Sequence, residues 1–188
     1  MLDNITTYQN EKQKGNYYII ADHLRTTIFA LGDGALIESK GRGYILRKLI
    51  KRSCLTAFFL NLSTADLLAI SQKIIEINGT FYTHLQEKKI QIMTNLEKEI
   101  VKEMNFITSA TKKIANYCSK NFQKIIPTHE IFLWYDTHGI PLELISYYLE
   151  EKGKDFFEAE FNQLLAEQKL RGKEDRKSKK INIFSKKQ

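Results

Sequence analysis

The fold follows from two stretches of the chain, IADHLRTTIFALGDG at residues 20–34 and GRGYILRKLIKR at residues 41–52. The first predicts a helix that Gly32 and Gly34 end, because glycine accepts backbone angles that other residues resist. The second predicts another helix, from Arg42 to Phe59. Together they indicate a helix, a glycine-rich turn and a second helix.

The chain before and after these stretches is also helical in pattern. We expect Asn16 to cap the first helix and residues 1–15 to form a polar linker. Ser63 begins a capping-box pattern for a third helix that ends at Gly79. A long helical pattern then runs from residue 80 to about 119 without Gly or Pro, over roughly 60 Å unless a break is hidden in it.

Shorter helices follow a boundary that we expect at residues 120–127. Thr128 is expected to cap a short helix that ends before Gly139. Pro141 fits the first turn of the next helix, and Asp155 begins the last helix. Strand-like alternation is absent. The predicted fold class is all-α. We expect a helical bundle (residues 16–119) that includes the long helix, a smaller C-terminal helical subdomain (128–170), and a basic, disordered tail (171–188).

Composition limits the classes of protein to consider. The chain has 188 residues, 43% of them hydrophobic, which is enough for a buried core. It shows no run of eighteen apolar residues and no secretory signal, so we expect no membrane partner. Cys54 and Cys118 lack CxxC spacing and are expected as free thiols, which indicates a cytoplasmic location.

Net charge alone says little about partners. The total is +7, but residues 171–188 hold eight basic and two acidic residues, which account for +6 of it. The remaining 170 residues carry only +1. A nucleic-acid partner must therefore be argued from where charge lies in the folded part of the chain.

One face of the second predicted helix is basic. At 100° per residue, four cations and Tyr44 fall within an arc of about 140°, and apolar residues such as Ile45 and Leu49 fill the other side. The helix offers no acidic partner, which favours binding to phosphates over the alternative of a merely solvated face. The phosphate-binding residues predicted here are Arg42, Arg47, Lys48, Lys51 and Arg52.

Asp136 lies in an apolar segment, residues 131–141, whose helix we expect to be buried. Its short carboxylate has two interpretations: a cap or turn hydrogen bond, which the spacing alone favours, and acceptance of a hydrogen bond from a base amino group. The four histidines show no metal-ligand spacing with each other or with the cysteines. We find no catalytic constellation, so neither catalytic residues nor a metal site is predicted.

Residues 20–34 and 41–52 resemble the segment that follows the catalytic core in alanyl-tRNA synthetases. A second match is YDTHGIP at residues 135–141, which is similar to the family's YDT(Y/H)G(F/I)P. A third, weaker one is the helix at residues 161–169 with Glu167 and Gln168, similar to a family helix containing EEQ. The order and approximate spacing of the three agree with the family.

The resemblance implies a helical domain that grips the acceptor stem of alanine tRNA and reads its G·U wobble pair. It implies that Asp136 is the acidic base reader. The family's second reader is an Asn within PSNEGRGY, where this chain has IESKGRGY, which puts Ser39 in the Asn position. The resemblance thus implies base reading by Asp136 and Ser39, and leaves strict G·U specificity open at Ser39.

The family's class II motifs for ATP and alanine are missing, as are the zinc motif of its editing domain and its oligomerisation region. The chain alone is thus expected to be non-catalytic and to bind no ATP or zinc. Its expected partners are the acceptor stem of alanine tRNA and a catalytic core in the same or another chain. Two alternatives stay open: a free-standing subunit acting in trans, and a diverged helical protein-interaction module.

Overall fold

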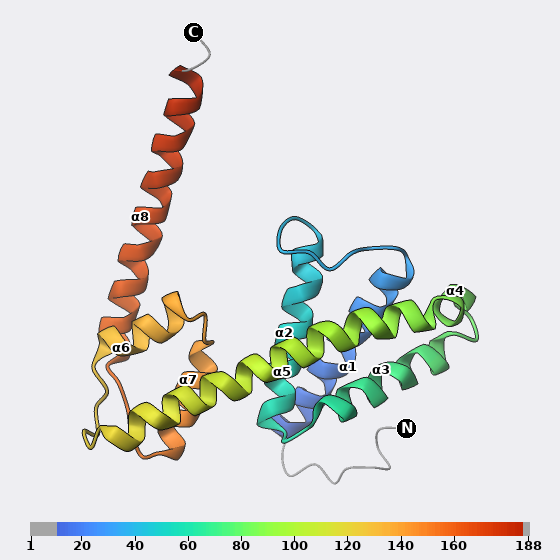
Figure 1. Ribbon diagram of the computed structural model, residues 1–188, viewed down its shortest axis with the longest axis horizontal. Helices are drawn as coiled ribbons and strands as arrows, with labels where there is room; N and C mark the ends of the chain where they lie inside the picture. The colour runs from blue at the N-terminus through green and yellow to red at the C-terminus, as the bar shows by residue number, and fades with distance from the viewer. Residues whose placement is uncertain (1–10, 186–188) are drawn as a thin grey trace. The chain divides into compact units, whose positions relative to one another are not determined.

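The computed structural model describes residues 11–185 and is all-α over that range, as the sequence predicted (Figure 1). The chain divides into two compact units, Met1–Ser109 and Ala110–Gln188. This division falls inside one long helix, before the 120–127 segment where the sequence predicted a boundary. The roles assigned to the two subdomains stay predictions.

In the first unit, α1 packs along α2 and also contacts α3 and α4. The apolar residues of each helix recur every three or four positions and are buried, as Ile20, Leu24 and Ile28 are in α1. Buried hydroxyls such as Ser71 Oγ donate to the carbonyl four residues earlier, 2.8 Å from Leu67 O. The helices are α1 (Glu11–Gly32), α2 (Gly43–Phe59), α3 (Thr64–Asn78), α4 (Thr83–Glu87) and α5 (Lys89–Lys120), of which α5 extends into the second unit.

Several local predictions are confirmed. Ser63 Oγ accepts a hydrogen bond from Asp66 N at 3.2 Å, and Asp66 Oδ2 accepts one from Ser63 N at 2.7 Å, which completes the capping box of α3. The second helix ends at Phe59 as predicted. By contrast, Ile45, which the pattern placed on the apolar side of this helix, is 58% exposed.

Two helix boundaries differ from the prediction. Helix α1 begins at Glu11 instead of near Asn16, because residues 11–14 (EKQK) are strong helix formers, so part of the predicted linker is helical. The long helical pattern is broken at Lys88, between α4 and α5. There Lys88 Nζ donates to Gly32 O at 2.7 Å, which satisfies a carbonyl at the C-terminus of α1.

The second unit has a hydrophobic core of its own. Its buried residues include Ile131, Trp134, Leu144 and Phe161, and α6 contacts α8. The elements are α6 (Thr128–Phe132), the π-helical turn η1 (Leu133–Thr137), α7 (Leu142–Glu151) and α8 (Glu158–Ser185).

Helix α8 differs from the prediction at both ends. It begins at Glu158 and not at Asp155, because the Asp155 backbone pairs with the 124–126 segment: Ile126 N donates to Asp155 O at 2.8 Å and Asp155 N donates to Lys124 O at 2.9 Å. It continues past Leu170 to Ser185. The disorder expected of residues 171–188 stays a prediction, and residues 186–188 and 1–10 lie outside the described residues.

Candidate nucleic-acid interface

The turn between α1 and α2 is a loop held close to the start of α2. Gly34 and Gly41 adopt φ of +93° and +65°, angles that favour glycine. A Cβ atom on Gly43 would overlap the carbonyl oxygen of Leu36 and lie 2.8 Å from Glu38 N. The backbone therefore approaches Gly43 more closely than any side chain allows, and the fold-back presents Ser39 in an exposed position.

Four of the five predicted phosphate-binding residues lie on α2, and the fifth, Arg42, is its N-cap. The structure separates the five into two groups, those in ion pairs with α5 and those exposed on the surface. Arg47 Nη2 lies 3.2 Å from Glu99 Oε1, and Lys51 Nζ lies 3.4 Å from Glu103 Oε2. Both carboxylates come from α5. The prediction that this basic face lacks acidic partners is therefore wrong, because the partners lie on another helix and not on α2 itself.

The signal for these ion pairs was present in the sequence. Arg47 and Lys51 are four residues apart, as are Glu99 and Glu103, so each pair is spaced by about one helical turn. The two basic residues can therefore face the two glutamates when one helix lies against the other. Because both glutamates lie on α5, the residue pattern of α2 alone could not indicate them. The Glu103 side chain is only 12% exposed and that of Glu99 only 14%, so both pairs join α2 to the core side of α5.

The other cations of α2 remain on the surface. Arg42, Lys48 and Arg52 are exposed. Among the residues that the structure describes, neither Arg42 nor Lys48 lies in a salt bridge, and Lys48 Nζ lies 4.9 Å from the centre of the exposed Tyr44 ring. Exposed cations beside an aromatic ring can neutralise phosphates and offer a stacking surface.

In the second unit, Asp136 lies on η1, the π-helical turn between α6 and α7. His138 N donates to Leu133 O at 3.2 Å, five residues back, and Gly139 follows with φ of +66°. Local π-turns widen a helix and often occur at functional sites. The carboxylate of Asp136 is exposed. It does not cap α7, whose N-cap is Pro141 with no side-chain hydrogen bond.

Two side chains from other helices meet this turn. Gln168 of α8 donates a hydrogen bond from Nε2 to Asp136 Oδ1. Lys113 of α5 lies within hydrogen-bond distance of His138 Nε2. Trp134, one residue before Tyr135, is buried with its ring 5.1 Å from that of Tyr117. The turn that presents Asp136 is thus anchored by a buried aromatic ring and by α5 and α8.

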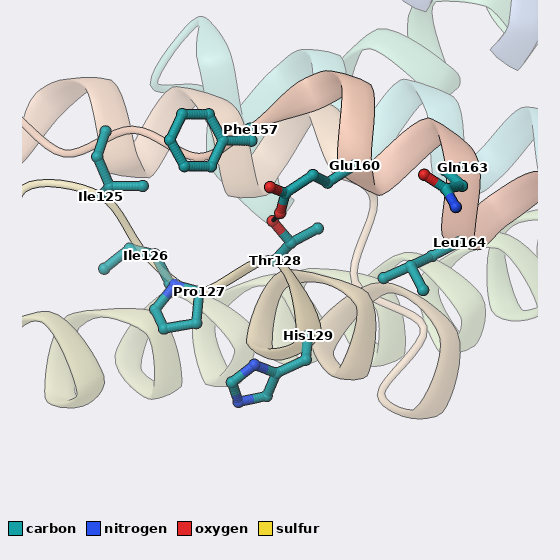
Figure 2. A pocket seen from close by; sticks show the side chains of 9 residues that line it. All are labelled: Ile125, Ile126, Pro127, Thr128, His129, Phe157, Glu160, Gln163 and Leu164. Atoms are coloured by element: carbon teal, nitrogen blue, oxygen red, sulfur yellow. Dashed lines mark hydrogen bonds between the residues drawn. The ribbon is translucent and has the colours of Figure 1, made fainter.

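The second unit also holds an open cavity of about 590 Å³ (Figure 2). Figure 2 shows Thr128 of α6 and Glu160 of α8 pointing toward one another, and Thr128 Oγ1 donates to Glu160 Oε2 at 2.6 Å. Because this polar pair is already satisfied, it offers no orphaned group to a ligand. None of the predicted site residues lines the cavity; its walls are Ile125, Ile126, Pro127, Thr128, His129, Phe157, Glu160, Gln163 and Leu164.

Both cysteines are buried free thiols. Burial raises the pKa of Cys54 to about 12, and the nearby Glu103 carboxylate adds to the shift while Lys51 opposes it. Within residues 11–185, no three His, Cys, Asp or Glu side chains gather as a metal site would require. No helix in the described part of the chain is long and apolar enough to cross a membrane.

Comparison with known proteins agrees with the resemblance of the motifs. A family described as tRNA synthetases class II (A) matches residues 2–188. The alanine–tRNA ligase of Carboxydothermus hydrogenoformans is 35% identical over 161 residues, covering 84% of this chain and 18% of the relative. Those of Campylobacter jejuni subsp. doylei and Sulfurimonas denitrificans are each 32% identical over 158 residues, which is 84% of this chain.

The chain therefore spans less than one fifth of the length of these relatives, 19% for the Campylobacter protein and 18% for the Sulfurimonas protein. The match nevertheless extends over nearly all of the present sequence and contains each of the three motifs. On these grounds the chain belongs to the class II (A) family of tRNA synthetases.

Proposed function

We propose that this chain is the tRNA acceptor-stem binding domain of an alanine–tRNA ligase. It supports the attachment of alanine to tRNA in the cytoplasm and is non-catalytic by itself. The observation that carries the proposal is the exposed cationic surface of α2, where Arg42 and Lys48 have no salt-bridge partner among the described residues. The relatives of this chain are named as alanine–tRNA ligases, so the phosphates of tRNA are the anions that we expect this surface to bind.

The phosphate contacts come first from Arg42 and Lys48. Arg52 is exposed beside them on α2. Arg47 and Lys51 contribute less, because their charges are already balanced by Glu99 and Glu103. Contacts of this kind supply affinity and salt dependence but do not read sequence.

Base reading is assigned to Asp136 and Ser39. A carboxylate oxygen accepts from the amino group of a base, whereas the Ser39 hydroxyl has a shorter reach and only one donor. Both residues are exposed, each on a turn of its own unit. The bulk of the discrimination for the G·U pair is therefore expected from Asp136.

We assign no catalytic residue, ATP site or zinc site to this chain. In this account the chemistry of alanine activation belongs to a catalytic core, either in the same protein or in another chain that this domain serves in trans. Mixing the chain with a catalytic core that lacks this segment tests the second arrangement. Restored charging of alanine tRNA would show that the domain acts in trans.

Two observations favour a different function, that of a diverged protein-interaction module. Two of the five predicted phosphate cations are engaged by Glu99 and Glu103, and Ser39 replaces the amide expected from the family. A binding titration decides between the two functions. Alanine tRNA labelled at its 3′ end is titrated with the full chain at low salt and followed by anisotropy; saturable binding supports RNA recognition, and its absence supports the module.

A further inference from the structure

Two of the motifs that resemble the family, far apart in sequence, meet at a single hydrogen bond. Asp136 belongs to the YDT motif on η1, and Gln168 belongs to the last helix, α8. The Gln168 amide donates to Oδ1 of Asp136. The contact joins a half-buried side chain to the exposed carboxylate that we propose as a base reader.

Gln168 lies on the face by which α8 packs against the rest of its unit. Phe161 is buried, Leu164 and Leu165 are half-buried, and Gln168 follows seven residues after Phe161, so all four share one helical face. The Phe161 ring lies 5.4 Å from that of Tyr135, the neighbour of Asp136 in sequence. Apolar packing thus holds α8 against η1 and brings the Gln168 side chain within reach of the Asp136 carboxylate.

The backbone beneath Asp136 is fixed independently of Gln168. Ile140 N donates to Trp134 O at 3.0 Å, and His138 N donates to Leu133 O at 3.2 Å. What the backbone does not fix is the rotation of the exposed carboxylate itself. A donor from a packed helix selects one orientation of that group and engages Oδ1, which leaves Oδ2 to accept from another donor.

We propose that Gln168 is a positioning residue for Asp136, which orients the carboxylate so that its second oxygen faces the base pair to be read. This inference rests on the proposed function, since it assigns a specificity role to a contact within the same site. A glutamine suits the task better than a lysine or arginine, because a neutral amide holds the carboxylate without neutralising its charge.

The test is a double-mutant cycle with two acceptor-stem minihelices of alanine tRNA, one with the G·U pair and one with G·C. The readout is the dissociation constant for the G·C minihelix divided by that for the G·U minihelix, measured with the 188-residue chain. We expect Gln168→Ala to lower this ratio by roughly 3- to 10-fold, which is within the range of the net contribution of one ordinary hydrogen bond. In the Asp136→Ala background the same change should have no effect, because the residue that it positions is gone.

Gln163→Ala is the matched control. Gln163 lies on the same helix, and its amide donates at 3.3 Å to another carboxylate, that of Glu167. It should leave the ratio unchanged. Equal weakening of both minihelices by Gln168→Ala, or an equal fall of the ratio with and without Asp136, would overturn the inference.

Failure of the inference and failure of the proposed function give different results. If the unmodified chain binds the two minihelices equally, both the proposed base reading and the inferred role of Gln168 are refuted. If the unmodified chain discriminates and Asp136→Ala abolishes the discrimination while Gln168→Ala does not, the proposed function stands and only the role of Gln168 is refuted.

Discussion

Replacing Arg42 and Lys48 together by glutamine removes the two cations of the α2 surface that have no salt-bridge partner among the described residues. Both side chains are exposed, so the change leaves no buried group without a partner and costs little stability. Each cation is expected to contact one phosphate. The substitution therefore tests the electrostatic part of the proposed interface without disturbing the fold.

The size of the effect follows from counterion release. Each phosphate contact contributes about 0.7 to 0.9 to the slope of log affinity against log salt, so two contacts contribute about 1.4 to 1.8. Raising the salt from about 50 to about 200 mM should then cost the unmodified chain roughly ten-fold more affinity than it costs the variant. At low salt the variant should bind all tRNA sequences more weakly and to a similar degree.

The assay is an anisotropy titration of labelled tRNA at four or more salt concentrations. The matched control is Arg47→Gln with Glu99→Gln, which removes one positive and one negative charge from a pair 3.2 Å apart and keeps the net charge. We expect the control to retain the slope of the unmodified chain. If the control lowers the slope as much as Arg42→Gln with Lys48→Gln does, then Arg47 contacts phosphate as well, and the claim that its ion pair removes it from the phosphate-binding surface is wrong.

Two further predictions concern stability. Gly43→Ala should destabilise the chain by about 1 to 3 kcal/mol in a thermal melt and weaken tRNA binding, because its Cβ would overlap backbone atoms of the 36–38 segment. The control is Gly15→Ala, where a Cβ would meet nothing within 4 Å; this change should instead stabilise α1 slightly in the same measurement. The pKa of Cys54 is raised from 9.0 to about 12, so the thiol keeps its proton in the folded state where the unfolded chain loses it, and folding stability should fall as pH rises above about 9. Denaturant unfolding at pH 8 and pH 10 should show a smaller fall for Cys54→Ala; an equal fall would mean that Cys54 does not titrate as its burial requires.

Features set by neighbours in sequence could be predicted without the structure. The capping box of Ser63 and Asp66 needs only residues three apart, and the glycines between α1 and α2 mark the turn by their own conformational freedom. The all-α class followed from helical periodicity along the whole chain. These features depend on residues that are close to one another in the sequence, so the sequence alone is enough to predict them.

Features set by packing between helices could not. The charge of Arg47 was assigned to phosphate because Glu99, fifty-two residues later, becomes its neighbour only when α5 packs on α2. The break at Lys88 contains neither Gly nor Pro, and its lysine reaches the carbonyl of Gly32 only in the folded state. The contact between Gln168 and Asp136 likewise depends on how α8 is anchored at Phe161.

The measurement that tests the central claim most directly is a paired titration of the full chain against alanine tRNA and its twin with the G·U pair changed to G·C. It is carried out with the unmodified chain and with Asp136→Ala. We predict tighter binding of the unmodified chain to the G·U tRNA, with a preference that Asp136→Ala reduces by roughly 5-fold or more, in the range of one base contact. Equal binding to both tRNAs by the unmodified chain, or an unchanged preference after Asp136→Ala, would contradict the account.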